Sequence, residues 1–280
     1  MKKAFFLSLI EARYGKAQSF GAALDVALPA FNETLETLLS HRSVRVFLET
    51  PLPQGTLEYL IAAAQSAPSS SNLQMWSVVA VEDGERKARL ADYADRQRHI
   101  KQAPLLLVFL ADMAMLHETA KAQNVPLDGI DYLDTFLMAA IDATLAAQNV
   151  VTAAEAMGFG TVYAGSIRNQ PEDVIRELSL PPHVFPVFGL SIGYPDPKRP
   201  VRVKPRLPQF AVLHREQYTN ANAQQAIADY DVTMAAFYRA YRETGTTWSK
   251  QSLARLHGSE SLVGRDRLKE AILRQGILLK

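Results

Sequence analysis

Cysteine is absent from this 280-residue chain. Its absence excludes disulfides, thiolate nucleophiles, iron–sulfur clusters and cysteine-ligated zinc. A metal site built on histidine is not expected either, because the six histidines never fall at metal-ligand spacing. An excess of one charge is also lacking. The formal net charge is +1, so no overall field attracts nucleic acid or an anionic membrane.

Long hydrophobic runs are lacking as well. After Lys2 and Lys3, the apolar stretch 4–10 is interrupted by Glu11 and Arg13 before any small-residue cleavage site. No window approaches the roughly 18 to 20 apolar residues that a membrane span needs. We therefore expect a cytoplasmic protein with neither a signal peptide nor a membrane span.

Helical and strand patterns alternate along the chain. Hydrophobic spacing predicts helices at 31–40, 56–67, 85–93, 131–158, from 171, 221–241 and 262–278, and strands at 76–81, 104–110, 161–164 and 184–192. The continuous apolar run at 104–110 is typical of a central strand. Interleaved helices and strands predict a layered α/β or α+β domain with the sheet in the middle.

The stretch His41-Arg42-Ser43-Val44-Arg45 is the strongest local signal for chemistry. A guanidinium is planar and presents a fixed fork of donors, which suits a phosphate or a developing oxyanion better than a lysine does. Taken alone, the stretch is more typical of an arginine-containing surface turn, because short basic runs are common.

A second basic stretch lies much later in the chain. Five basic residues occupy nine positions without an acid: Lys198, Arg199, Arg202, Lys204 and Arg206. Taken alone they indicate a solvated loop. Together with His41 and Arg42 they suggest two sides of a phosphate site.

Three further segments contain small or hydroxyl-bearing residues that bear on ligand binding. Gly165 and Ser166 follow a predicted strand and let backbone approach a flat ring. Gly158 and Gly160 follow a helix and precede a strand, which is the wrong order for a dinucleotide fingerprint. The serines 69–71 lack the surroundings of a nucleophile elbow, so hydrogen bonding to a ligand or plain solvation is expected there. No pair of carboxylates indicates an acid/base couple.

Together these segments resemble the flavin-dependent nitroreductase family, in particular its oxygen-insensitive, NADPH-preferring nitroreductase and flavin reductase branch. The resemblance rests on motifs spread in order over residues 41–208: HRSVR at 41–45, SSSNLQ at 69–74, QRH at 97–99, AAQN at 146–149, GTVYAGSIRN at 160–169, FGLSIG at 188–193 and KPRLP at 204–208.

The resemblance implies an α+β fold, resembling three α/β/α layers, with a mixed, mainly antiparallel sheet wrapped by helices. It implies an intertwined homodimer with FMN at the subunit interface. We accordingly expect an N-terminal extension at 1–30, an FMN-binding core at 31–215, and a C-terminal helical segment of the same domain at 216–280.

The resemblance also assigns roles to residues. The FMN phosphate and ribityl chain are expected to contact His41, Arg42, Ser43, Lys204 and Arg206. Further cofactor residues are expected around the ring: Arg45 near N1 and the C2 carbonyl, Ser69, Ser71 and Gln97 at its polar edge, the Gly165 backbone near N5, and Tyr163, Ala164, Ser166 and Ile167 packed about it. Ser70 and Gln74 are also expected to bind the cofactor.

The implied activity is reduction of nitroaromatics or quinones by ping-pong hydride transfer from NAD(P)H through FMN. No side chain is expected to act as a catalytic acid, base or nucleophile, since the cofactor carries the chemistry. Arg239 and Arg242 are possible contacts of the NADPH phosphate, but Glu243 follows them and NADH stays open. Small aromatic acceptors are the expected substrates.

Two alternatives stay open. One is a flavin reductase that supplies reduced FMN to a partner oxygenase. The other is a flavin-binding protein without reductase activity.

Overall fold

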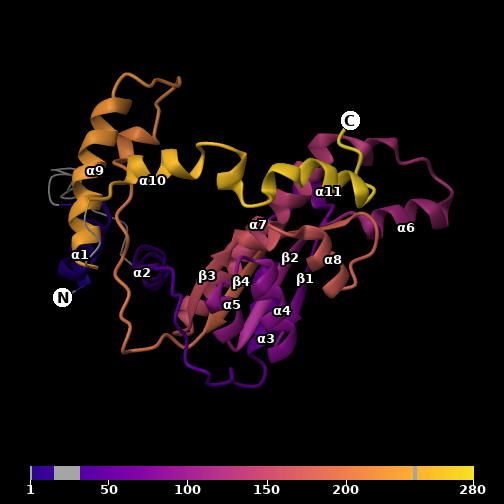
Figure 1. Cartoon of the computed structure of the whole chain (residues 1–280), viewed down its shortest axis with the longest axis horizontal. Helices are drawn as coiled ribbons and strands as arrows, with labels where there is room; N and C mark the ends of the chain where they lie inside the picture. Colours follow the sequence, from indigo (N-terminus) through magenta and orange to yellow (C-terminus); the bar gives the residue numbers. More distant parts are fainter. Residues whose placement is uncertain (1, 16–31, 242–244) are drawn as a thin grey trace. The chain divides into compact units, whose positions relative to one another are not determined.

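A four-stranded antiparallel sheet organises the larger part of the molecule (Figure 1). Its strands are β1 (Trp76–Val81), β2 (Leu105–Asp112), β3 (Gly160–Ala164) and β4 (Val184–Gly193), in the spatial order β1-β2-β4-β3. All three ladders are antiparallel. In the part of the chain that the structure describes, residues 2–15, 32–241 and 245–280, the one parallel pairing is an isolated bridge between Ser43 and Thr161. The expected fold class is confirmed.

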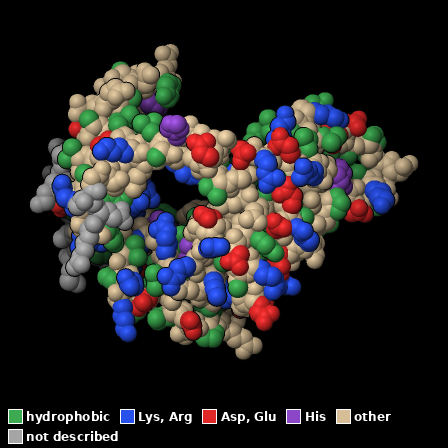
Figure 2. Space-filling view, viewed as in Figure 1, with side chains coloured by type: hydrophobic (Ala, Val, Ile, Leu, Met, Phe, Trp, Pro, Cys, Tyr) green, Lys and Arg blue, Asp and Glu red, His purple; other side chains and the backbone are tan. Residues whose placement is uncertain are grey.

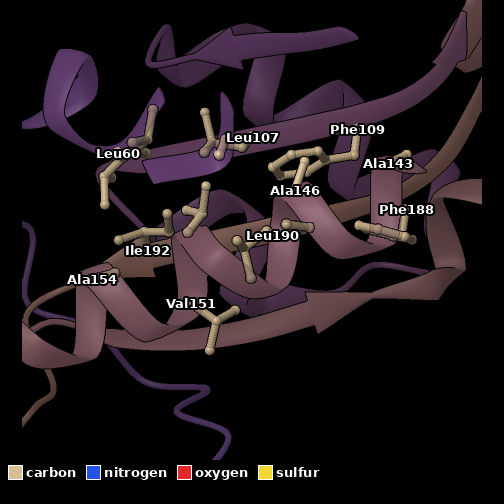
Figure 3. Close-up of a cluster of buried hydrophobic side chains, with 14 of the residues drawn as sticks. Leu60, Leu107, Phe109, Ala143, Ala146, Val151, Ala154, Phe188, Leu190 and Ile192 are labelled. Carbon is tan, nitrogen blue, oxygen red and sulfur yellow. The ribbon is translucent and has the colours of Figure 1, made fainter. Parts of the chain in front are cut away.

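Strand β2 is buried on both faces, as its continuous apolar run predicts. Leu105, Leu107 and Phe109 point into one hydrophobic cluster. Leu106 and Val108, the residues between them, point into a second cluster on the opposite face. This division follows from the two-residue side-chain period of a strand. Figure 3 shows the first cluster, where Leu107 and Phe109 lie with Leu190 and Ile192 of the neighbouring strand β4.

Helices cover both faces of the sheet. On one face, the first cluster includes Leu60 of α3 (Thr56–Gln65) and Ala146 of α7 (Leu133–Ala156). Small alanine side chains let α7 approach closely. The other face is covered by three helices that contribute to the second cluster: α4 (Gly84–Tyr93), α5 (Arg98–Gln102) and α8 (Pro171–Glu177). The result is the expected helix–sheet–helix layering.

Two helices in the sheet-containing part of the chain differ most from the sequence prediction. The helix predicted at 262–278 is shorter, since α11 spans Leu268–Arg274 after a 3₁₀ turn, η8 (Arg265–Arg267). Left-handed backbone at Gly264 and Gly276 interrupts the helix on either side. Helix α6 (Ala114–Gln123) was not predicted, and none of its residues is buried.

A second compact unit consists mainly of helices. Contacts group residues 1–42 with 201–261, and residues 43–200 with 262–280. The former, unit 1, contains α1 (Lys2–Tyr14), α2 (Glu33–Ser40), α9 (Ala223–Arg239) and α10 (Trp248–Arg255). We refer to the sheet-containing group as unit 2. The expected boundaries at residues 30 and 215 stay predictions.

Local signals explain the helices of unit 1. The Asn32 side chain accepts a hydrogen bond from the Leu35 N–H (3.0 Å) and caps α2. Buried Tyr230, Met234 and Tyr238 recur at intervals of four along α9 and form its core. Helix α10 was missed by the sequence prediction; Thr247 caps it.

Helix α7 is long and apolar enough to cross a membrane by length and composition, which the sequence prediction did not anticipate. This criterion is weak, since the core helix of a soluble protein meets it too. Nine residues of α7 are buried, and the helix packs on the sheet.

Basic and acidic side chains both occur on the face of the molecule shown in Figure 2.

Candidate functional site

The first basic stretch begins where α2 ends. The His41 N–H donates to the Leu38 carbonyl and closes the helix. Arg42 is exposed, and its Nη1 donates to the Ser40 carbonyl (3.2 Å). Both residues belong to unit 1, so the end of α2 fixes the backbone from which their side chains project.

The part of the second basic stretch from Arg202 to Arg206 belongs to the same unit and is fastened by α9. The Tyr230 hydroxyl donates to the Pro205 carbonyl at 2.8 Å, and this bond is buried. The Lys204 ammonium lies 5.7 Å from the ring centroid of Tyr238. The Arg206 guanidinium donates to the carbonyls of Lys204 and Pro205, both at 3.3 Å. Two aromatic residues of one helix face therefore position this proline-containing stretch.

Arg13 connects the two basic stretches and was not singled out from the sequence. Its Nη1 donates to the Lys204 carbonyl (3.0 Å). Its Nη2 donates to the carbonyls of Leu39 (3.0 Å) and His41 (3.1 Å). Within unit 1 the structure thus brings together the backbone of both stretches that were predicted to bind phosphate.

Ser43 and Arg45 lie in unit 2, beside strand β3. The Val44 N–H donates to the Thr161 carbonyl (2.9 Å), and Val44 is 3 % exposed. A Cβ at Gly160 would lie 2.7 Å from Val44 Cγ2, so only glycine accommodates this packing. Because Val44 points inward from extended backbone, its neighbours Ser43 and Arg45 point the other way.

The segment after β3 divides into a buried and an accessible part. Ala164 and Ile167 are 3 % and 0 % exposed and belong to the second cluster, so their side chains serve the core. Gly165 and Ser166 start a 3₁₀ turn and are partly accessible. Tyr163 is 37 % exposed, and its ring packs edge-on against that of Phe188, with 5.2 Å between the ring centroids. Tyr163, Gly165 and Ser166 can therefore offer contacts to a ligand.

Arg168 connects this turn to strand β4. Its Nη1 donates to the Val187 carbonyl, and burial lowers the pKa of its guanidinium. A Cβ at Gly165 would lie 3.4 Å from Arg168 Nη2. A side chain at 165 would therefore lie in van der Waals contact with the guanidinium.

The serine loop has unusual backbone. Ser71, Asn72 and Gln74 have φ of 49°, 57° and 52°, in the left-handed region that non-glycine residues seldom adopt. The Ser70 N–H donates to Oδ1 of Asp142 on α7 (2.9 Å). Asp142 is 1 % exposed, and its Oδ2 lacks a hydrogen-bond partner among the described residues. The loop is thereby anchored to a buried carboxylate that the sequence did not reveal.

Gln97 precedes a buried histidine. Gln97 is partly exposed at the start of α5. Two residues later, His99 is buried, and its Nδ1 lies 3.2 Å from Ser191 Oγ. Burial, and secondarily the charge of Arg45, lowers the pKa of His99 to about 4. A neutral His99 therefore lies within electrostatic range of Arg45, the residue expected to face the flavin.

The arginines predicted to contact the NADPH phosphate lie at and beyond the end of α9. Arg239 is exposed at the end of α9. Arg242 lies outside the described residues. No group of three or more metal-ligating side chains was found within the described ranges. A cavity of about 670 Å³ in unit 2, lined in part by Arg96, Asn169 and Arg267, includes none of the predicted cofactor residues.

Comparison with known proteins gives consistent matches. The model of the nitroreductase family matches residues 38–194, and that of its C-terminal domain matches 204–280. NADPH-flavin oxidoreductase of Vibrio harveyi is 38 % identical over 229 residues, covering 81 % of this chain and 92 % of that protein. Oxygen-insensitive NADPH nitroreductase of Salmonella typhimurium is 37 % identical over 218 residues, covering 77 % and 88 %. The structure of NfrA2 from B. megaterium superimposes with a TM-score of 0.84 at 36 % identity, covering 89 % of this chain and all of that one.

Proposed function

This chain belongs to the nitroreductase family, and from that premise we propose that it is an FMN-dependent NAD(P)H oxidoreductase that reduces nitroaromatics or quinones. The structural observation that carries the proposal is the joining of two basic stretches within unit 1. His41 and Arg42 are supplied by one, and Lys204 and Arg206 by the other. A set of guanidinium, ammonium and imidazole donors fits a phosphomonoester such as that of FMN.

Unit 2 supplies groups suited to the ring. The partly accessible backbone of Gly165 and the strained serine loop offer hydrogen-bonding groups at fixed positions. FMN held by these residues would supply the hydride-transfer chemistry between NAD(P)H and the second substrate. Arg45 would supply a permanent positive charge to the flavin site, which would favour the reduced, negatively charged cofactor. Tyr163, Gly165 and Ser166 would hold the ring through contact.

The choice between nicotinamide cofactors rests on Arg239 and Arg242. Arginine at these positions favours the additional phosphate of NADPH, and the relatives from V. harveyi and S. typhimurium are named for NADPH. NADH stays a second donor in the proposal.

The proposal is tested by anaerobic absorbance titration of the purified protein with NADPH and, separately, with NADH. A yellow protein bleached by one of them is the expected result. A yellow protein bleached by neither would contradict the proposal and favour a flavin-binding protein without reductase activity. Arg45→Ala, fully loaded with FMN, should be reduced more slowly. Arg176→Ala serves as the control, because the Arg176 side chain is 70 % exposed and pairs with Asp173 on its own helix.

A flavin reductase is the second candidate function. It is favoured by the V. harveyi relative and by an FMN reductase of Bacillus subtilis that is 38 % identical over 227 residues. Steady-state turnover of free FMN, compared with that of a quinone and a nitroaromatic under the same NADPH concentration, separates the two. Preference for free FMN would favour release of reduced flavin to a partner oxygenase.

We also propose a homodimer. Four exposed apolar residues follow one another at intervals of four along α7: Leu133, Leu137, Ile141 and Leu145, at 48, 47, 52 and 37 % exposure. An apolar stripe of this kind marks an interaction surface. A second copy of this chain is the proposed partner, since the expected cofactor site lies at a subunit interface. A cytoplasmic location is part of the same proposal.

A further inference from the structure

Helix α1 lies outside both regions that match the family, which begin at residues 38 and 204. It nevertheless has a buried face. Leu9 and Ile10 are 8 % and 4 % exposed, and Arg13, one helical turn later, is 6 % exposed. Arginine is seldom buried to this extent unless its donors are satisfied. Arg13 therefore has a specific task within unit 1.

The bonds of Arg13 show what that task is. Its two terminal nitrogens contact different segments: Nη1 donates to the Lys204 carbonyl, and Nη2 donates to the carbonyls of Leu39 and His41. A planar guanidinium presents several donors at fixed angles, whereas an ammonium is a point charge. The side chain thus sets the separation of the two segments.

Each of these segments needs such a partner. Leu39 is in the last turn of α2, where helix carbonyls lack partners within the helix. A cation at this end also complements the helix dipole. The other segment is extended, and its Arg206 N–H donates to the carbonyl of Arg13 (2.8 Å). One residue therefore contacts the backbone of His41, Lys204 and Arg206, three of the residues assigned to the phosphate.

We propose that Arg13 is a positioning residue for the FMN phosphate, holding the two basic stretches at the separation that binding requires. This inference rests on the proposed function, because it presupposes that the stretches bind FMN. Arg13 does so through carbonyl oxygens and not by contact with the cofactor. A segment outside the family regions thereby becomes part of the cofactor-binding apparatus.

The test is the affinity of the flavin-free full chain for FMN and for riboflavin, measured by quenching of flavin fluorescence. Riboflavin lacks the phosphate, so it reports the ring-binding part alone. In Arg13→Ala the dissociation constant for FMN should rise by about tenfold or more, with little change for riboflavin. Arg13→Lys should lie between, because lysine keeps the charge without the fork. Ser8→Ala is the matched control, since Ser8 is exposed on α1 and donates to Phe5 of the same helix.

Two results would overturn the inference while the proposed phosphate site stands. One is unchanged FMN affinity in both Arg13 variants while Lys204→Ala and Arg206→Ala bind FMN weakly; the proposed phosphate site would then stand without Arg13. The other is an equal loss of FMN and riboflavin affinity, which would indicate general destabilisation. Unchanged FMN affinity in Lys204→Ala and Arg206→Ala would instead refute the phosphate assignment itself, together with the inference built on it. Arg13→Lys keeps the test decisive if Arg13→Ala does not fold.

Discussion

The buried histidine of α5 makes the stability of the protein depend on pH in a defined direction. His99 is 6 % exposed, and its pKa is lowered to about 4 by burial and by Arg45. In the unfolded chain an imidazole has a pKa of about 6.5. The folded state therefore favours neutral His99. Its contribution to stability is complete above about pH 6.5 and is lost as the pH falls toward 4.

The magnitude follows from the two pKa values. One pKa unit corresponds to about 1.4 kcal/mol, so the full difference of about 2.5 units is worth about 3.4 kcal/mol. Between pH 8 and pH 5 the unfolded imidazole becomes charged while the folded one stays largely neutral. The expected loss in the free energy of unfolding over that interval is about 2 kcal/mol.

The assay is urea unfolding of the wild type and of His99→Gln at pH 8 and pH 5. Glutamine removes the titration and keeps a polar group beside Ser191 Oγ. Carboxylates also titrate toward pH 5, so the difference between the two proteins isolates His99. The wild type should lose about 2 kcal/mol more than the variant. His257→Gln, whose side chain is 84 % exposed, should behave as the wild type. Equal pH dependence in wild type and His99→Gln would refute the reasoning.

Two further predictions concern packing and assembly. In Gly193→Ala the new Cβ would lie 2.5 Å from Pro104 Cδ, and a proline ring cannot rotate away. Urea unfolding should therefore show that the free energy of unfolding falls by about 1–3 kcal/mol. Gly84→Ala, whose new Cβ would meet nothing within 4 Å, is the control, and an equal effect of both substitutions would contradict the packing explanation. Ile141→Lys places a charge on the apolar stripe of α7 and should convert a dimer to a monomer in light scattering coupled to size exclusion. Met115→Lys, at an exposed apolar residue of α6, is the control and should leave the dimer intact. A dimer that survives Ile141→Lys would exclude this stripe as the interface.

The sequence predicted the sheet well because the strand signal is local. β1 has the predicted bounds, and the apolar runs at 104–110 and 184–192 mark the two central strands. The shortened C-terminal helix shows the opposite case. Periodicity continues through 262–278, but the left-handed conformation of Gly264 and Gly276 depends on backbone geometry that periodicity does not report.

Part of the candidate site was likewise evident from the sequence, and part of it was not. The basic stretches and the serine loop were evident from residue type, and the family resemblance assigned them roles. Arg13 was not evident, because its bond to Lys204 spans 191 positions in sequence. Asp142 was concealed for a similar reason, since it resembles any polar residue on an amphipathic helix until Ser70 is placed against it. Long-range bonds of this kind have no sequence signal of their own.

The backbone of the serine loop sets two kinds of selection against each other. Three neighbouring non-glycine residues, Ser71, Asn72 and Gln74, hold left-handed φ values that glycine adopts without penalty. Selection for folding stability alone would drive these positions toward glycine over evolutionary time. Selection for catalytic turnover would retain side chains that can contact a cofactor. Replacing them by glycine should therefore relax the loop backbone while removing side chains that the proposed function assigns to the cofactor.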